Sequence, residues 1–166
     1  MLILLCYSLV LLVFKDVLAF RPLILPAHVN STLLPNGTLS PAPKEPHRLI
    51  NMFVHPPVAV DFSGYGNPIS QGSVDVCLYK ALDEALNTRQ HSMLTPIATR
   101  DLDYNNNNVS LNFDSLGLAI WEEWKNVLYL ILEFVDKYDT REFFFATHVL
   151  CGSEWYRVGR GCLSTI

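Results

Sequence analysis

The sequence predicts an α+β domain, a two-layer sandwich in which two helices cover one face of an antiparallel sheet. Two patterns support this prediction. Residues 114–140 place apolar side chains at alternating steps of three and four, which is typical of one wide face of a helix. Residues 58–62 instead alternate between two sides, which is typical of a strand with one buried face. Along the chain the expected elements follow the order β-α-β-β-α-β, which has a ferredoxin-like character.

Length and composition are those of a single globular domain. The chain has 166 residues, of which 50% are hydrophobic and 17% are charged, so there is enough apolar material for one core. The formal net charge is −4, and the basic residues are scattered singly, with Arg157 and Arg160 the nearest to a pair. A nucleic-acid binder would cluster its basic residues, so this class is not expected.

The first 19 residues are interpreted as a signal peptide. Residues 2–14 form an apolar run of secretory length, Lys15 and Asp16 interrupt it, and residues 17–19 offer modest side chains for cleavage before Phe20. The usual positive charge before the apolar run is missing. Two alternatives stay open, an uncleaved signal anchor and a buried strand.

Residues 20–57 are expected to form an extended, proline-rich tail or linker. Eight of the ten prolines fall here, and proline removes a backbone donor and fixes φ. Two glycosylation sequons begin in this segment at Asn30 and Asn36, and a third begins at Asn108 in a predicted loop. The remaining residues, 58–166, are expected to form the single α+β domain.

The helix within 114–140 is predicted to be the main core element. Its longest unbroken apolar run, Val127–Leu132, is far too short to cross a bilayer. Glu122, Glu123 and Asn126 are expected on its solvated side. The buried face is expected to consist of Trp121, Trp124, Leu128, Ile131, Val135 and Tyr138.

The other elements are inferred from the same periodicities and from turn residues. Ser73 fits the N-cap of a first helix, and Pro96 argues for an edge strand. The prediction is a helix at 73–87, an edge strand at 93–100, a polar hairpin loop at 101–108, a strand at 109–113, a central strand, apolar on both faces, at 143–151, and a strand or extended tail at 155–163. Gly159 and Gly161 in the last segment would let a helix approach closely.

Cysteine usage predicts one disulfide. After signal cleavage Cys77, Cys151 and Cys162 remain, and an oxidising compartment favours one pair and one leftover thiol. Cys151 and Cys162 frame a short glycine-containing segment, which favours their pairing over the two alternatives. Cys77 is interpreted as a core residue. A catalytic pair of Cys151 with His148 is not expected, because residues three apart on a strand point to opposite faces.

No catalytic, cofactor or metal site is expected from the motifs. The histidines lack metal-binding spacings, and no nucleophile elbow is present. The run 101–107 alternates oxygen-bearing side chains as a calcium loop does. However, Asn106 stands where that loop needs glycine, and Asn112 stands where it needs a bidentate glutamate. The run is therefore interpreted as a solvated hairpin loop.

The second half of the chain resembles a known group of proteins. The residues that carry the likeness are Trp121-x-x-Trp124, Phe134-Val135-x-x-Tyr138, the phenylalanine-rich strand from Phe143, and Val158-Gly159-x-Gly161-x-Leu163. On these residues the region 57–166 resembles uncharacterised small secreted proteins of filamentous ascomycete fungi. The resemblance implies secretion and a fungal source, and it brings no catalytic residues. Cys151, Arg160 and Cys162 depart from the small or hydroxyl residues expected in the closing segment.

Together these features favour a secreted, non-enzymatic binding or effector-like domain. Its expected partner is a protein or an extracellular surface component, with no nucleic acid, no cofactor, and no membrane after signal cleavage. An unpaired cysteine permits a covalent dimer. Two alternatives stay open: a small extracellular hydrolase whose site is assembled from residues distant in sequence, and a membrane-tethered protein that keeps residues 2–20.

Overall fold

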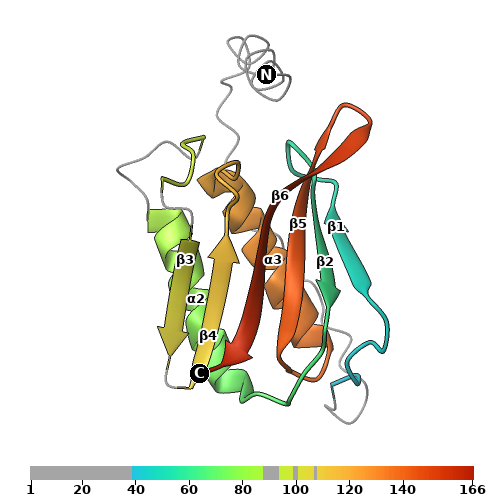
Figure 1. The fold of residues 1–166 in the computed structure, drawn as a ribbon, viewed down its shortest axis with the longest axis vertical. Coiled ribbons are helices and arrows are strands. Elements are labelled where there is room, and N and C mark those ends of the chain that lie inside the picture. The colour runs from blue at the N-terminus through green and yellow to red at the C-terminus, as the bar shows by residue number, and fades with distance from the viewer. Residues whose placement is uncertain (1–38, 88–93, 99–100, 107) are drawn as a thin grey trace. The chain divides into compact units, whose positions relative to one another are not determined.

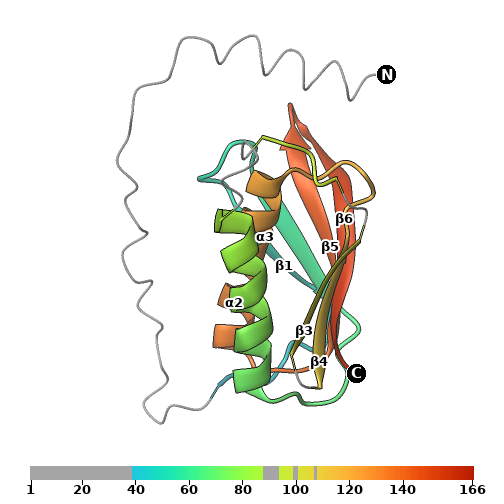
Figure 2. The ribbon, with the colours of Figure 1, turned by 90° about the vertical axis from the view of Figure 1, so that its left-hand side faces the viewer.

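Two helices cover one face of a single sheet (Figures 1 and 2). A computed structural model describes residues 39–87, 94–98, 101–106 and 108–166 of the chain. The predicted signal peptide, the sequons at Asn30 and Asn36, and the first part of the proline-rich segment lie outside the described residues. The elements are strands β1 (His47–Asn51), β2 (Val58–Ser63), β3 (Asp101–Asn106), β4 (Val109–Asp114), β5 (Phe143–Cys151) and β6 (Glu154–Thr165), and helices α2 (Gln71–Asn87) and α3 (Trp121–Lys137).

The predicted α+β sandwich is confirmed, but the ferredoxin-like strand order is not. The sheet order is β1-β2-β5-β6-β4-β3, and every neighbouring pair is antiparallel. Strand β6 lies between β4 and β5, so the segment predicted as a last strand or tail occupies the middle of the sheet. Helix α2 packs over β3 and β4, and α3 packs over β1 and β2. Both helices therefore lie on the same face, as right-handed crossovers require.

Helix α3 contributes more buried residues to the core than any other element, as its periodicity predicts. Trp121, Trp124, Leu128, Ile131 and Val135 are buried, and Tyr138 packs against the cluster while partly exposed. The prediction of a solvated face is wrong for Glu123 and Asn126, which are both buried. The Glu123 carboxylate accepts a 3.0 Å hydrogen bond from the backbone N–H of Ile120, and so satisfies a donor at the start of the helix.

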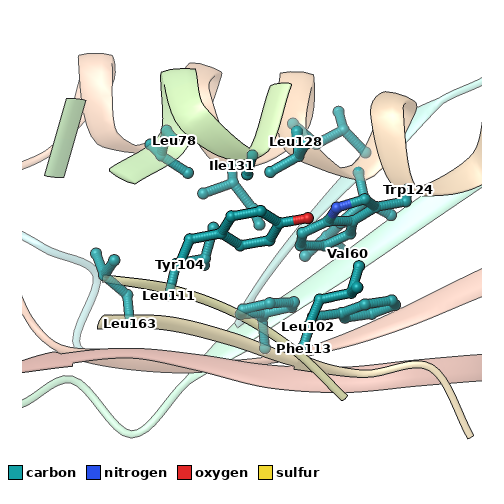
Figure 3. Packing of buried hydrophobic residues seen from close by; sticks show 14 of the residues in the cluster. Val60, Leu78, Leu102, Tyr104, Leu111, Phe113, Trp124, Leu128, Ile131 and Leu163 are labelled. Atoms are coloured by element: carbon teal, nitrogen blue, oxygen red, sulfur yellow. The ribbon is translucent and has the colours of Figure 1, made fainter. Parts of the chain in front are cut away.

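Aromatic stacking joins α3 to the sheet. The Trp124 ring stacks on Phe113 of β4, with centroids 4.1 Å apart and planes 13° from parallel. Phe134 stacks on Phe62 of β2 at the same centroid distance. Figure 3 shows Trp124 between the helix and the sheet, with its indole nitrogen toward the Tyr104 hydroxyl. Desolvation raises the pKa of Tyr104 well above its usual value, so its hydroxyl stays protonated in this core.

The proline-rich tail ends earlier than predicted. Residues 47–51 form β1, which pairs with β2 from His47 opposite Phe62 to Asn51 opposite Val58. Pro46, Pro56 and Pro57 flank this strand and do not interrupt it, so each of its residues keeps a backbone donor. The high proline content of this segment led to the prediction of a tail, and the short edge strand β1 between the prolines was therefore missed.

The region before β4 also differs from the prediction. Residues 94–98, within the predicted edge strand, form only an isolated bridge from Pro96 to Ile120, and 99–100 lie outside the described residues. The strand is instead β3, within the segment interpreted as a polar loop. Leu102 and Tyr104 are buried while Asp101 and Asp103 are exposed, so buried and exposed side chains alternate along β3 as in a strand with one covered face. Charged outward residues are typical of an edge strand.

Helix α2 begins at Gln71, two residues before the predicted cap at Ser73. The backbone N–H of Val74 already donates to the Ser70 carbonyl at 3.2 Å, which places Ser73 inside the first turn. The predicted buried face is correct for Val74, Cys77 and Leu78.

The two glycines of β6 make room for aromatic rings, and not for the helix backbone as predicted. A Cβ on Gly159 would lie 2.4 Å from the Phe113 ring, and one on Gly161 would lie 2.4 Å from the Phe145 ring. The second would also lie 2.1 Å from the backbone oxygen of Asn112, which cannot rotate away.

Gly161→Ala is therefore expected to destabilise the fold by about 2 kcal/mol or more, because the added methyl group forces the sheet to move. The measurement is the free energy of unfolding from urea denaturation. Gly72→Ala is the matched control, since nothing lies within 4 Å of a Cβ there and helices favour alanine. Equal stability of the Gly161→Ala variant and the wild type would contradict this packing.

Glu142 holds the start of β5 to the end of β6. Its carboxylate accepts hydrogen bonds from the N–H and the hydroxyl of Thr165, at 3.1 and 2.5 Å, and from the N–H of Asn67 at 3.1 Å. These bonds, led by the Thr165 hydroxyl, lower the pKa of Glu142 below its usual value. The ionised form is thus favoured by folding.

A carboxylate with a lowered pKa stabilises the fold above its ordinary pKa, and this contribution is lost as the pH falls through the folded-state value. Glu142→Gln is expected to lower the midpoint of urea unfolding at neutral pH. On acidification, this variant should lose less stability than the wild type does. Glu45→Gln, at an exposed position before β1, is the control. An identical acid dependence in the wild type and the Glu142→Gln variant would refute this assignment.

Candidate functional site

No helix or strand that the structure describes covers the sheet face opposite the helices, called here the outer face (Figure 2). Its side chains follow from the alternation along β5, where Phe143, Phe145, Thr147 and Val149 are buried. The residues between them, Phe144, Ala146, His148 and Leu150, therefore point outward. This corrects the prediction that β5 is apolar on both faces: the strand is central, but only one face is covered.

Strand pairing aligns polar residues from four strands on the outer face. Ala146 lies opposite Asp61 on one side and Arg160 on the other, and Arg160 lies opposite Asp114. One row therefore carries charges of both signs across the sheet. A second row contains Ser63, Phe144, Cys162 and Asn112. A bulge after Thr147 then brings Arg157 opposite His148.

Two recesses hollow the middle of the outer face. Their volumes are about 460 and 360 Å³, and they share Phe144, Phe145 and Arg157. The first is completed by Asp101, Asn112, Asp114, Arg160, Gly161 and Cys162. The second is completed by Pro46, His47, Arg48, Asp61, Ser63 and Ala146. A ligand lying across both recesses would pass over Phe144 and Arg157.

Asp61 has two partners, Arg48 and His148. Its carboxylate lies 2.9 Å from Nε of Arg48 and 3.5 Å from Nδ1 of His148. Burial lowers the pKa of His148 below its usual value, although Asp61 opposes this effect. At neutral pH the histidine is therefore mainly uncharged. The Arg48 guanidinium also lies over the Trp155 ring, 5.4 Å from its centroid, which fixes its position.

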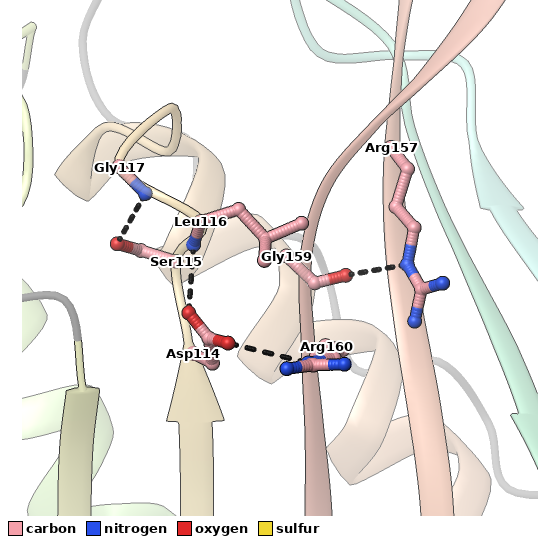
Figure 4. A network of polar contacts seen from close by, with 7 residues as sticks. All are labelled: Asp114, Ser115, Leu116, Gly117, Arg157, Gly159 and Arg160. Carbon is pink, nitrogen blue, oxygen red and sulfur yellow. Dashed lines mark hydrogen bonds and ion pairs between the residues drawn. The ribbon is translucent and has the colours of Figure 1, made fainter.

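Arg160 is partnered in a similar way (Figure 4). Its Nε lies 3.2 Å from a carboxylate oxygen of Asp114, and the other oxygen accepts a 3.0 Å hydrogen bond from the N–H of Leu116. Leu116 has a positive φ of 49°, and Asp114 stabilises the turn that contains it. Because the Arg160 side chain is exposed, this ion pair contributes little to stability.

Arg157 differs from these two arginines. Its Nε donates to the carbonyl of Gly159 at 3.5 Å (Figure 4), and among the described residues no carboxylate forms an ion pair with it. The exposed guanidinium thus keeps donors for a planar anionic group. Phe144, which lines the same two recesses, is 61% exposed, and its ring lies against Gly64, where a Cβ would be 2.6 Å away.

The His148–Asp61 contact has one element of a hydrolase site, a base beside an orienting carboxylate. Among the described residues, however, no serine, threonine or cysteine side chain is hydrogen-bonded to His148. Asp61 is also engaged by Arg48. The outer face thus contains a candidate base without an activated nucleophile.

The predicted disulfide between Cys151 and Cys162 is wrong for the structure. Cys151 lies at the tip of the β5–β6 hairpin opposite Glu154, and Cys162 lies opposite Phe144. Seven residues separate these positions along β5, or about 23 Å, against a limit of about 7 Å between the Cα atoms of a disulfide. The described residues contain no disulfide, and Cys77 is buried with its thiol 3.4 Å from the Val109 carbonyl.

The other predicted positions are distributed around the domain. Asn108 is exposed in the turn between β3 and β4, where a glycan has access. Within the described residues no group of histidine, cysteine or acidic side chains has the arrangement of a metal site. No helix in the described part of the chain is long and apolar enough to cross a membrane.

Sequence reasoning missed the outer face because its residues are distant in the chain. Asp61, His148 and Arg157 come together only through the β2–β5–β6 register. The alternation along β5 was the one available signal, since it separates Phe144 from Phe143 and Phe145. Comparisons with family models, with curated proteins and with solved structures found no match to this chain.

Thiol reactivity provides a direct check on the cysteine positions. Burial raises the pKa of Cys77, so its thiol is both inaccessible and protonated. In the folded protein Cys162 should react with iodoacetamide much faster than Cys77, and all three thiols should react after denaturation without reductant. Peptide mass mapping measures both. A Cys151–Cys162 crosslink, or rapid labelling of Cys77 in the folded protein, would contradict the structure.

Proposed function

We propose that the protein is a secreted, non-enzymatic binding domain and that its ligand lies on the outer face of the sheet. The observation that carries this proposal is the position of Arg157. It lines both recesses together with the exposed Phe144, and it has no carboxylate partner among the described residues. Secretion is proposed from the apolar segment at 2–14, which lies outside the described residues.

The distribution of basic residues supports the same face. Of the four arginines in the described part of the chain, Arg48, Arg157 and Arg160 line the recesses. The described lysines lie elsewhere: Lys80, Lys125 and Lys137 on the helices, and Lys44 before β1. Arginine binds carboxylates and sulfates through two parallel hydrogen bonds, which lysine cannot form.

The shape and chemistry indicate an extended anionic ligand. Arg157 supplies a planar donor for an acidic group, and Phe144 supplies an apolar surface on which a sugar ring can stack. The recesses are shallow and follow one another across the sheet, which suits a chain of linked units. An acidic polysaccharide of an extracellular surface has this chemistry, and it agrees with the expected class of partner.

A hydrolase is the second candidate, and the observation that favours it is the contact between His148 and Asp61. In such an enzyme His148 would accept a proton from an attacking water. Appearance of shorter products during the binding experiment would favour this function over simple binding.

Arg157→Ala is expected to weaken binding of a uronic-acid oligosaccharide by roughly tenfold or more, since a charge-assisted bidentate contact contributes about 1.5–3 kcal/mol. Binding is measured by NMR titration of the protein purified from culture medium, whose intact mass should correspond to a chain that begins at Phe20. The largest chemical-shift changes are expected at residues around Phe144 and Arg157.

Lys125→Ala is the charge-matched control, because it removes one positive charge from α3 on the opposite layer. The neutral oligosaccharide of the same length controls for the acidic group. Equal binding of both sugars, or equal weakening by the two substitutions, would overturn the proposed site.

A further inference from the structure

The side chain of His148 lies on the outer face between strands β2 and β6. It points outward from β5 and is 17% exposed, and Arg157 of β6 lies directly opposite it. Residues directly opposite each other on antiparallel strands place their Cβ atoms roughly 5 Å apart. Because Arg157 lines both recesses, a charge on His148 stands close to the proposed ligand.

A buried nitrogen of this imidazole is placed to donate a proton to a carboxylate. Nδ1 forms no hydrogen bond with a described residue, yet it lies 3.5 Å from Oδ2 of Asp61. The other oxygen of Asp61, Oδ1, lies 2.9 Å from Nε of Arg48. Because the two partners use different oxygens, a protonated imidazole can donate to Asp61 without displacing Arg48.

The charged groups that face His148 come from each strand around it. Among the described residues they are Asp61 of β2, Arg48 of β1 and Arg157 of β6. While His148 is neutral, two arginines and one aspartate leave this group with one net positive charge. Protonation of His148 adds a second positive charge, and it does so beside the arginine that the ligand contacts.

We propose that His148 makes ligand binding on the outer face dependent on protons, because its protonated form strengthens the contact of Arg157 with an acidic ligand. The inference rests on the proposed function and adds a regulation to the same site. The imidazolium attracts the bound acidic group, and the bound group in turn stabilises the imidazolium. Binding and protonation therefore strengthen each other by the same factor.

The direction of the pH dependence follows from the surroundings of His148. Burial lowers the pKa of His148 below 6.5, its ordinary value, although Asp61 opposes this effect. The neutral form therefore dominates at pH 7.5, and the charged form appears as the pH falls through the lowered pKa. A uronic acid stays ionised over this range, since such carboxyl groups titrate at about pH 3.5. Affinity should thus rise as the pH falls from 7.5 to 5.0.

The test uses the full chain and the uronic-acid oligosaccharide, titrated at pH 7.5, 6.5, 5.5 and 5.0. The wild type is compared with His148→Gln, whose side chain stays polar and cannot gain a charge. His55→Gln is the matched control, because His55 is an exposed histidine outside the residues that line the recesses. Circular dichroism confirms that each variant is folded. NMR of the His148 imidazole in the wild type measures its pKa with and without the oligosaccharide, which requires no variant.

Wild-type affinity is expected to rise by roughly fivefold between pH 7.5 and 5.0, as one added charge near the ligand contributes at a protein surface. His55→Gln should show the same rise, and His148→Gln should show none. The oligosaccharide should also raise the pKa of His148 in the wild type.

The outcomes separate this proposal from the function on which it rests. Binding that does not change with pH, or a His148 pKa that the oligosaccharide leaves unchanged, would overturn the regulation and leave the binding site intact. A rise that persists in His148→Gln would also overturn it, and would indicate His47, the other histidine at the recesses. Absence of binding at every pH would overturn both proposals.

Discussion

The packing of two phenylalanine rings against the glycines of β6 determines the layout of the domain. Phe113 and Phe145 lie where side chains of Gly159 and Gly161 would otherwise stand. Because these rings lie close to the sheet, Trp124 can stack on Phe113 at 4.1 Å and lie near Phe145, which joins α3 to the sheet. Interiors packed this closely leave no room for an added methyl group, so the glycines are structural requirements.

This inward packing also determines the character of the outer face. The large side chains of the central strands that point inward are buried in the core. Both helices pack on that inner face, so neither covers the outer face. Phe144 is the exception among the aromatic residues of β5, since it points outward and stays exposed although the core has aromatic neighbours on either side of it. An exposed ring in the middle of a sheet leaves apolar surface in water, which favours a role in recognition.

The sequence was sufficient for elements with a strong local pattern. The face of α3 and the strand at 58–62 could be predicted because three- and two-residue periods appear directly in the residue order. Strand β3 could not, because Asp101, Asp103 and Asn105 make its outward positions look like a loop. Strand β1 was concealed by the prolines on both sides of it. The candidate site was beyond prediction because Asp61 and His148 meet only through strand pairing, and no local pattern encodes the register of distant strands.

The ion pairs on the outer face explain why Arg157, among the described arginines, is the one proposed to bind an acidic group. Arg48 is matched by Asp61, and Arg160 is matched by Asp114, so each of these pairs adds little net potential. His148 is kept mainly neutral by burial and cannot cancel or add charge at neutral pH. Arg157 lines both recesses and forms no ion pair with a described carboxylate, although Asp101 also lines the first recess. In a protein whose formal net charge is −4, an acidic ligand would be repelled from most of the surface and would find its favourable contact at this position.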